Sequence, residues 1–193
     1  MTHATYATVL RPEARVPARL YDLAMIAAGS VLVTLTAQVS VLLPFTPVPI
    51  TGQTFGVLLV GALLGSVRGG LALLFYLAEG VAGLPVFAGG AAGPVYLLGP
   101  TGGYLLAFIP AAMLVGFLAE RGWDRRFFTT FSAMIAGTAV IFAGGLAWLS
   151  VFAPEGQLLS MGLLPFLTGA AIKIVAAALI LPLGWKLPWL DGR

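Results

Sequence analysis

The sequence has no cysteine, one histidine and few charged residues, and each shortage excludes a class of protein. Without cysteine, the 193-residue chain forms no disulfide and no thiolate metal site. Charged residues make up 9% of the chain, whereas soluble domains average about 25%. His3 is the one histidine, and no nucleophile–base pair or metal-binding cluster accompanies it. We therefore expect neither a soluble domain, nor a catalytic site, nor a metal site.

Hydrophobic residues make up 60% of the chain and occur in long runs, which predicts an all-α integral membrane protein. The length suits one membrane domain over residues 1–193. Residues 1–18 are expected to be a mobile cytoplasmic tail, and no cleavable signal peptide is recognisable. Six transmembrane segments are predicted, the second and third of them short: about Leu20–Leu43, Phe55–Val67, Leu71–Val81, Tyr104–Leu118, Phe127–Val151 and Leu163–Leu183.

The basic residues are unevenly distributed between the two sides of the membrane that the predicted segments cross. Of the ten Lys and Arg, all but Lys173 lie before the first segment, between segments two and three, between four and five, or after six. By the positive-inside rule these regions are cytoplasmic, so both termini lie in the cytoplasm of a cell inner (plasma) membrane protein. The net charge of +3 is thus read as a topology signal, and no nucleic-acid partner is expected.

Lys173 lies within the sixth segment, in its outer half, where an ionisable residue is costly and usually faces the bundle interior. One interpretation is that its ammonium extends to the lipid headgroups. The other is that it pairs with an anionic ligand beneath the outer loops. Glu79, near the outer end of the third segment, is a candidate partner for Lys173 or for a ligand, or is a headgroup-level carboxylate without a specific role.

The stretch from Gly83 to Tyr104, GLPVFAGGAAGPVYLLGPTGGY, contains no charged residue. It is too rich in Gly and Pro to be helical throughout and too apolar for a solvated loop, and such backbone belongs where protein or a cavity satisfies its polar groups. We expect it to form an outward-facing loop over a ligand pocket. It lacks the GlyLys[Ser/Thr] ending of a phosphate-binding loop, so no nucleotide site is predicted.

Three blocks carry a resemblance to a known family: TPVPITGQT (46–54), GLPVFAGG with GPTGGY (83–90 and 99–104), and PFLTGAAIK (165–173). The chain resembles the BioY family of biotin transporters, the S components of energy-coupling-factor (ECF) transporters, over about residues 22–185. The resemblance implies a six-helix, membrane-embedded biotin-binding protein. It also implies two kinds of partner, a transmembrane coupling subunit and ATPase subunits, and no cofactor besides the transported biotin.

In that picture Lys173 takes the biotin carboxylate. Gln53 and Thr51 are further candidates for hydrogen bonds to the ligand. The outer loop would shape the pocket through Gly83, Pro85, Val86, Phe87, Gly99, Thr101, Gly102 and Tyr104.

Two positions depart from the family pattern. Ala170 stands where an acid is usual, so a second polar anchor beside Lys173 is absent or is supplied elsewhere, for example by Glu79. Gly52 stands where the family often has Leu.

Ala24 and Ala28 form a small-residue face on the first segment. By the resemblance this face docks the coupling subunit; packing within the chain is the alternative.

Three other functions remain open from the residues: an S component for thiamin or riboflavin, a structural membrane protein without a ligand and with a filled core, and a membrane enzyme. The sequence does not decide whether the protein transports alone, its oligomeric state or its transport mechanism.

Overall fold

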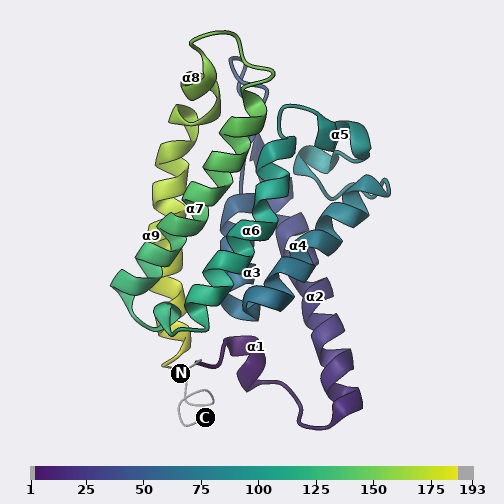
Figure 1. The fold of residues 1–193 in the computed structure, drawn as a ribbon, viewed down its shortest axis with the longest axis vertical. Helices are drawn as coiled ribbons and strands as arrows, with labels where there is room; N and C mark the ends of the chain where they lie inside the picture. Colours follow the sequence, from purple (N-terminus) through teal and green to yellow (C-terminus); the bar gives the residue numbers. More distant parts are fainter. Residues whose placement is uncertain (1–2, 187–193) are drawn as a thin grey trace.

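The computed structural model describes residues 3–186, which are mostly helical (Figure 1). A two-stranded antiparallel ladder pairs Ser40 with Thr51 and Val41 with Ile50. In chain order the elements are α1 (Tyr6–Val9), α2 (Arg15–Gln38), β1 (Ser40–Val41), β2 (Ile50–Thr51), α3 (Gln53–Leu64), α4 (Ser66–Val81), η1 (Ala88–Gly90), α5 (Pro94–Leu98), α6 (Gly102–Ala119), η2 (Trp123–Arg125), α7 (Phe127–Leu149), α8 (Leu158–Gly162) and α9 (Leu164–Gly184).

Within the described residues, four stretches are long and apolar enough to cross a membrane: Val16–Gln38, Gly102–Ala119, Phe127–Leu149 and Leu158–Gly184. The helices α3 and α4 have 12 and 16 residues. Each is shorter than the roughly 20 residues that a straight crossing needs. The predicted second and third segments correspond to these two short helices.

The first predicted segment, Leu20–Leu43, is displaced along the chain, because α2 runs from Arg15 to Gln38. It begins earlier because Pro17 is tolerated in the first turn of a helix. It ends earlier because Ser40 and Val41 form β1, and the Val39 carbonyl accepts a hydrogen bond from the amide of Gly52 at 2.9 Å. The apolar run thus continues past the helix as extended chain.

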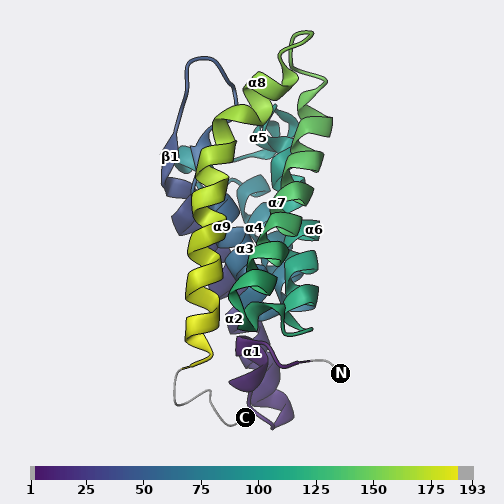
Figure 2. The ribbon, with the colours of Figure 1, turned by 90° about the vertical axis from the view of Figure 1, so that its left-hand side faces the viewer.

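The long helices stand side by side, with α1 and the C-terminal end of α9 at one end of the bundle and α5 and α8 at the other (Figures 1 and 2). We call these the α1 end and the α8 end. The central helix is α6, which packs against α3, α4 and α7. Close approach is possible because Gly61 of α3 lies against α6: a Cβ there would be 2.5 Å from the carbonyl oxygen of Ala112.

Residues 3–18 contact the bundle in the described structure, and the mobile cytoplasmic tail stays a prediction. Ala7 of α1 is 3% exposed. The Tyr6 ring packs on Trp185, with ring centroids 4.2 Å apart, and its hydroxyl donates to the Leu181 carbonyl. The His3 amide donates to the Glu120 carbonyl at 2.6 Å. Apolar burial and backbone hydrogen bonds therefore hold this segment across the α1 end.

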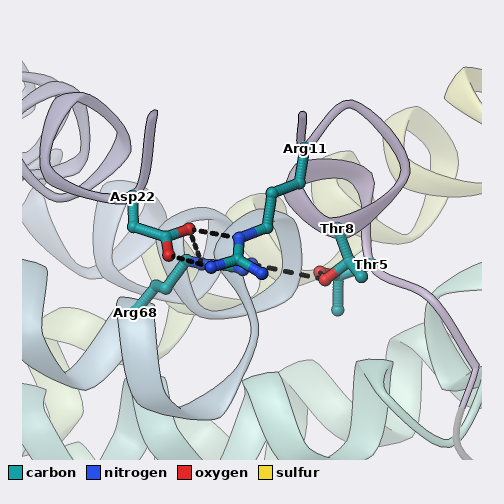
Figure 3. Close-up of polar contacts among 5 residues, drawn as sticks. All are labelled: Thr5, Thr8, Arg11, Asp22 and Arg68. Atoms are coloured by element: carbon teal, nitrogen blue, oxygen red, sulfur yellow. Dashed lines mark hydrogen bonds and ion pairs between the residues drawn. The ribbon is translucent and has the colours of Figure 1, made fainter. Parts of the chain in front are cut away.

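A charged cluster at the α1 end joins α1, α2 and the start of α4 (Figure 3). Asp22 of α2 accepts from Arg11 Nη2 at 2.7 Å and from Arg68 Nε at 2.8 Å. Arg68 Nη1 also lies 3.3 Å from the hydroxyl of Thr8, which is 3.0 Å from the Thr5 hydroxyl. The predicted basic residues of two separate loops thus share one carboxylate.

Asp124, in η2 at the same end, is 2% exposed. Its Oδ2 accepts from Trp185 Nε1 at 2.7 Å, and its Oδ1 has no hydrogen-bond partner within residues 3–186. Burial raises the pKa of this carboxyl to about 6. The ordinary value is about 3.9.

This raised pKa predicts a pH-dependent stability. Because the folded state keeps the proton to higher pH than the unfolded state, the stabilising contribution is complete below about pH 4 and is lost as the pH rises through about 6. Each unit of pKa difference corresponds to about 1.4 kcal/mol. Melting of the purified protein between about pH 4.5 and 7 should show this loss, whereas Asp124→Asn, which keeps the acceptor for Trp185, should lack it. An equal slope in both proteins would contradict the assignment to Asp124.

Candidate functional site

A cavity lies among α3, α6, α7 and α9 and is bounded towards the α8 end by residues of the 46–54 and 83–101 segments. Its volume is about 60 Å³. The side walls are apolar, with Leu58, Leu105, Phe108, Ile141, Phe142 and Phe166. The polar lining residues are Thr51, Gln53, Thr54, Tyr96, Thr101, Tyr104, Thr138 and Lys173.

Lys173 lines this cavity from α9, as predicted for an inward-facing side chain. Its Nζ donates to the Thr51 carbonyl at 2.6 Å and to the Thr54 hydroxyl at 2.9 Å. An ammonium has three donors, so one remains for another acceptor. None of the described lining residues is acidic. The cavity is therefore an apolar enclosure with one cation that neutral oxygen atoms hold in place.

Glu79 does not pair with Lys173 in the described structure, and that alternative is wrong. Its carboxylate accepts a hydrogen bond from the hydroxyl of Ser30, a fully buried residue of α2. It is also absent from the cavity lining. Ala170 does line the cavity. The groups that meet Lys173 are the Thr51 carbonyl and the Thr54 hydroxyl, and a second polar anchor for a ligand beside Lys173 stays a prediction.

The 83–101 segment contributes fewer lining residues than expected. Of the predicted residues in the Gly83–Tyr104 stretch, Thr101 and Tyr104 line the cavity, and Tyr104 donates to the Gly162 carbonyl at 2.7 Å. Six others do not line it: Gly83, Pro85, Val86, Phe87, Gly99 and Gly102.

Two of these six, Val86 and Phe87, lie directly behind the lining. The ring of Phe87 is fully buried and stacks on Tyr96, a lining residue, with centroids 5.3 Å apart. Tyr76 donates to the Val86 carbonyl at 3.1 Å and accepts from Gln53 Nε2 at 2.6 Å. The 83–101 segment thus holds Tyr96 and Gln53 in position. A direct contact of these six residues with a ligand stays a prediction.

Sequence reasoning missed several lining residues, and these residues differ in whether any sequence feature could have pointed to them. Thr54 and Phe166 lie inside two of the blocks that carry the family resemblance, so their positions were marked without a role. Tyr96 lies in the predicted outer loop. Thr138 is a single hydroxyl in the apolar run of α7, and nothing in the pattern distinguishes it from a packing residue.

Comparisons with known proteins show which family this chain resembles. The sequence model of the BioY family matches residues 8–188. The biotin transporter BioY of Thermotoga maritima is 39% identical, covering 81% of this chain and 92% of its own length. That of Rhizobium etli is 36% identical, covering 79% and 86%. A crystal structure of the S-component for biotin from an ECF-type ABC transporter superposes with a TM-score of 0.77 at 27% identity, covering 90% of this chain and 95% of that chain. The chain belongs to the BioY family.

Proposed function

We propose that this protein is the membrane-embedded, biotin-binding component of a vitamin uptake system. The observation that carries the proposal is Lys173, whose ammonium lies in an apolar cavity without an acidic lining residue. Relatives are named as biotin transporters, and the structural neighbour as an S-component for biotin. Their names describe transporters, so we assign no catalysed reaction and no cofactor, and biotin is the transported ligand.

The chemistry of biotin suits this cavity. Its valerate chain and sulfur-containing ring match walls made of Leu, Ile and Phe side chains. Its carboxylate matches the third donor of Lys173, which Thr51 and Thr54 hold without a competing negative charge. A charge-assisted hydrogen bond of this kind is roughly twice as strong as a neutral one. The cavity as described has room for a few water molecules, so entry of the vitamin requires movement of the 83–101 or 46–54 segment.

We further propose six membrane crossings, with both termini in the cytoplasm. The support is the distribution of charge, because Arg11, Arg68, Arg125 and Lys186 belong to connections or helix ends at the α1 end. That end is then cytoplasmic in the cell inner (plasma) membrane. The α8 end, with the 83–101 segment and the cavity, faces outward. The short helices α3 and α4 complete the six crossings.

The proposed partners are a transmembrane coupling subunit and the ATPase subunits of an ECF module. Ala24 and Ala28 are exposed on α2, and a small-residue face lets a second helix approach closely. The neighbouring Gly29 is buried and packs on Ala72, so it serves the chain's own core. Co-purification with a coupling subunit that is lost in Ala24→Leu/Ala28→Leu would support this face.

Sided membrane vesicles test binding and orientation together. Vesicles with the outer face outward should bind labelled biotin saturably, and unlabelled biotin should displace it far better than biotin amide, because the amide lacks the carboxylate for Lys173. Inside-out vesicles should bind little until they are permeabilised. Absence of binding in both preparations would contradict the proposed ligand, displacement by thiamin or riboflavin would point to another vitamin, and binding only to inside-out vesicles would reverse the orientation.

A further inference from the structure

Thr138 differs from the other hydroxyl-bearing residues near it on α7. Thr130 and Ser132 each donate to the carbonyl four residues earlier, at 2.8 and 2.9 Å. Thr129 donates to the Arg126 carbonyl at 3.0 Å. The hydroxyl of Thr138 forms no hydrogen bond with any residue of the described range 3–186, although the residue is only 8% exposed. Because Asp124 Oδ1 is the fully buried side-chain atom without a partner in this range and the Thr138 hydroxyl is not, this hydroxyl is accessible from the cavity that Thr138 lines.

The cavity provides the place for a hydrogen-bond partner. Thr138 lines it beside the apolar side chains of Leu58 and Ile141. With a rise of 1.5 Å per residue, Thr138 lies about 17 Å from the end of α7 at Leu149, and Lys173 about 14 Å from the start of α9 at Leu164. Both helix ends are at the α8 end of the bundle (Figure 2). The hydroxyl is therefore as deep in the cavity as the lysine, or slightly deeper.

The other polar groups in the helical walls already have partners. Thr54 accepts from Lys173, and Tyr104 donates to the Gly162 carbonyl. Gln53 is bonded to both Thr51 and Tyr76. Tyr96 and Thr101 belong to the 83–101 segment, at the rim. Thr138 thus differs from these wall residues in that its hydroxyl forms no hydrogen bond within residues 3–186, so both its donor and its acceptor sites remain for a second polar part of a ligand.

We propose that Thr138 hydrogen-bonds the ureido group of the ligand and so determines specificity for it. The inference rests on the proposed biotin function, in which Lys173 takes the carboxylate. Biotin has one other strongly polar part, the ureido ring at the opposite end of the molecule. A hydroxyl matches that ring because it donates to a ureido carbonyl or accepts from a ureido N–H. The apolar lining side chains then contact the carbon skeleton.

The test measures the affinity of purified protein for two acids by displacement of labelled biotin. One is biotin, and the other is 5-(tetrahydrothiophen-2-yl)pentanoate, which keeps the carboxylate and sulfur ring but lacks the ureido ring. Thr138→Val keeps the shape and removes the hydroxyl, and should weaken biotin binding roughly 2- to 13-fold, as for one neutral hydrogen bond. Its affinity for the ureido-free acid should equal that of the wild type. Thr138→Ser should restore biotin binding.

Ile141→Val, a change in the same wall, is the matched control and should weaken both acids alike because it removes only a methylene group. Equal losses for both acids in Thr138→Val, or no loss for biotin, would overturn the role of Thr138. Failure of the wild type to bind biotin would instead contradict the proposed function, so the two failures are distinguishable.

Discussion

Replacing Lys173 with alanine should weaken biotin binding by roughly two to four orders of magnitude. The Lys173 ammonium lies in an apolar cavity, where Thr51 and Thr54 supply its acceptors. Removing one partner of a buried ion pair costs about 3–5 kcal/mol, because the remaining charge is left without compensation. In the variant that charge is the biotin carboxylate. Calorimetric titration of the purified proteins with biotin measures the loss.

Two controls separate this role from general damage. Lys186→Ala removes a lysine that is exposed beyond the end of α9, and it should bind biotin as the wild type does. Biotin amide should bind Lys173→Ala and the wild type with similar affinity, because it has no carboxylate to lose. Wild-type affinity for biotin equal to that for biotin amide would contradict the carboxylate role of Lys173.

Gly80→Ala should destabilise the protein and weaken biotin binding through the 83–101 segment. A Cβ at Gly80 would lie 2.0 Å from Cζ of Phe87. The Phe87 ring cannot easily retreat, since it is fully buried and stacks on the lining residue Tyr96. The Gly80 carbonyl also accepts the amide of Gly93 at 2.7 Å. Overpacking a core costs about 1–3 kcal/mol, so the melting temperature should fall, and the displaced Tyr96 should lower biotin affinity.

A matched substitution and a compensating one test that mechanism. Gly99 lies in the 83–101 segment, and the nearest atom to a Cβ added there is 3.4 Å away. The melting temperature of the Gly99→Ala variant should therefore be close to that of the wild type. Combining Gly80→Ala with Phe87→Leu makes room for the new methyl group, so the double variant should lose less than the sum of the single losses. Strict additivity would show that the clash with Phe87 is not the cause.

The membrane character and the helical segments could be predicted from the sequence because long apolar runs and the positions of Arg and Lys are local properties. The cation in the cavity was also predictable, since a lysine nine residues inside an apolar helix needs an inward-facing environment. The predicted boundaries of the first segment were less accurate. The apolar run continues beyond Gln38, where α2 ends, but pairing with Ile50–Thr51 makes this continuation extended chain. The packing of residues 3–18 on the bundle depends on contacts with Glu120 and Trp185, far along the chain.

By itself, the sequence determined that the chain is a membrane protein with a Gly- and Pro-rich segment near one cation, because composition and spacing decide these features. Only the tertiary structure decided which groups meet that cation. Thr54 reaches Lys173 across 119 positions of the chain, whereas Glu79 turns to Ser30. Thr138 became a candidate only when its helix was seen to turn it into the cavity without a partner. Such pairings depend on which helix faces come together, and no local pattern carries that information.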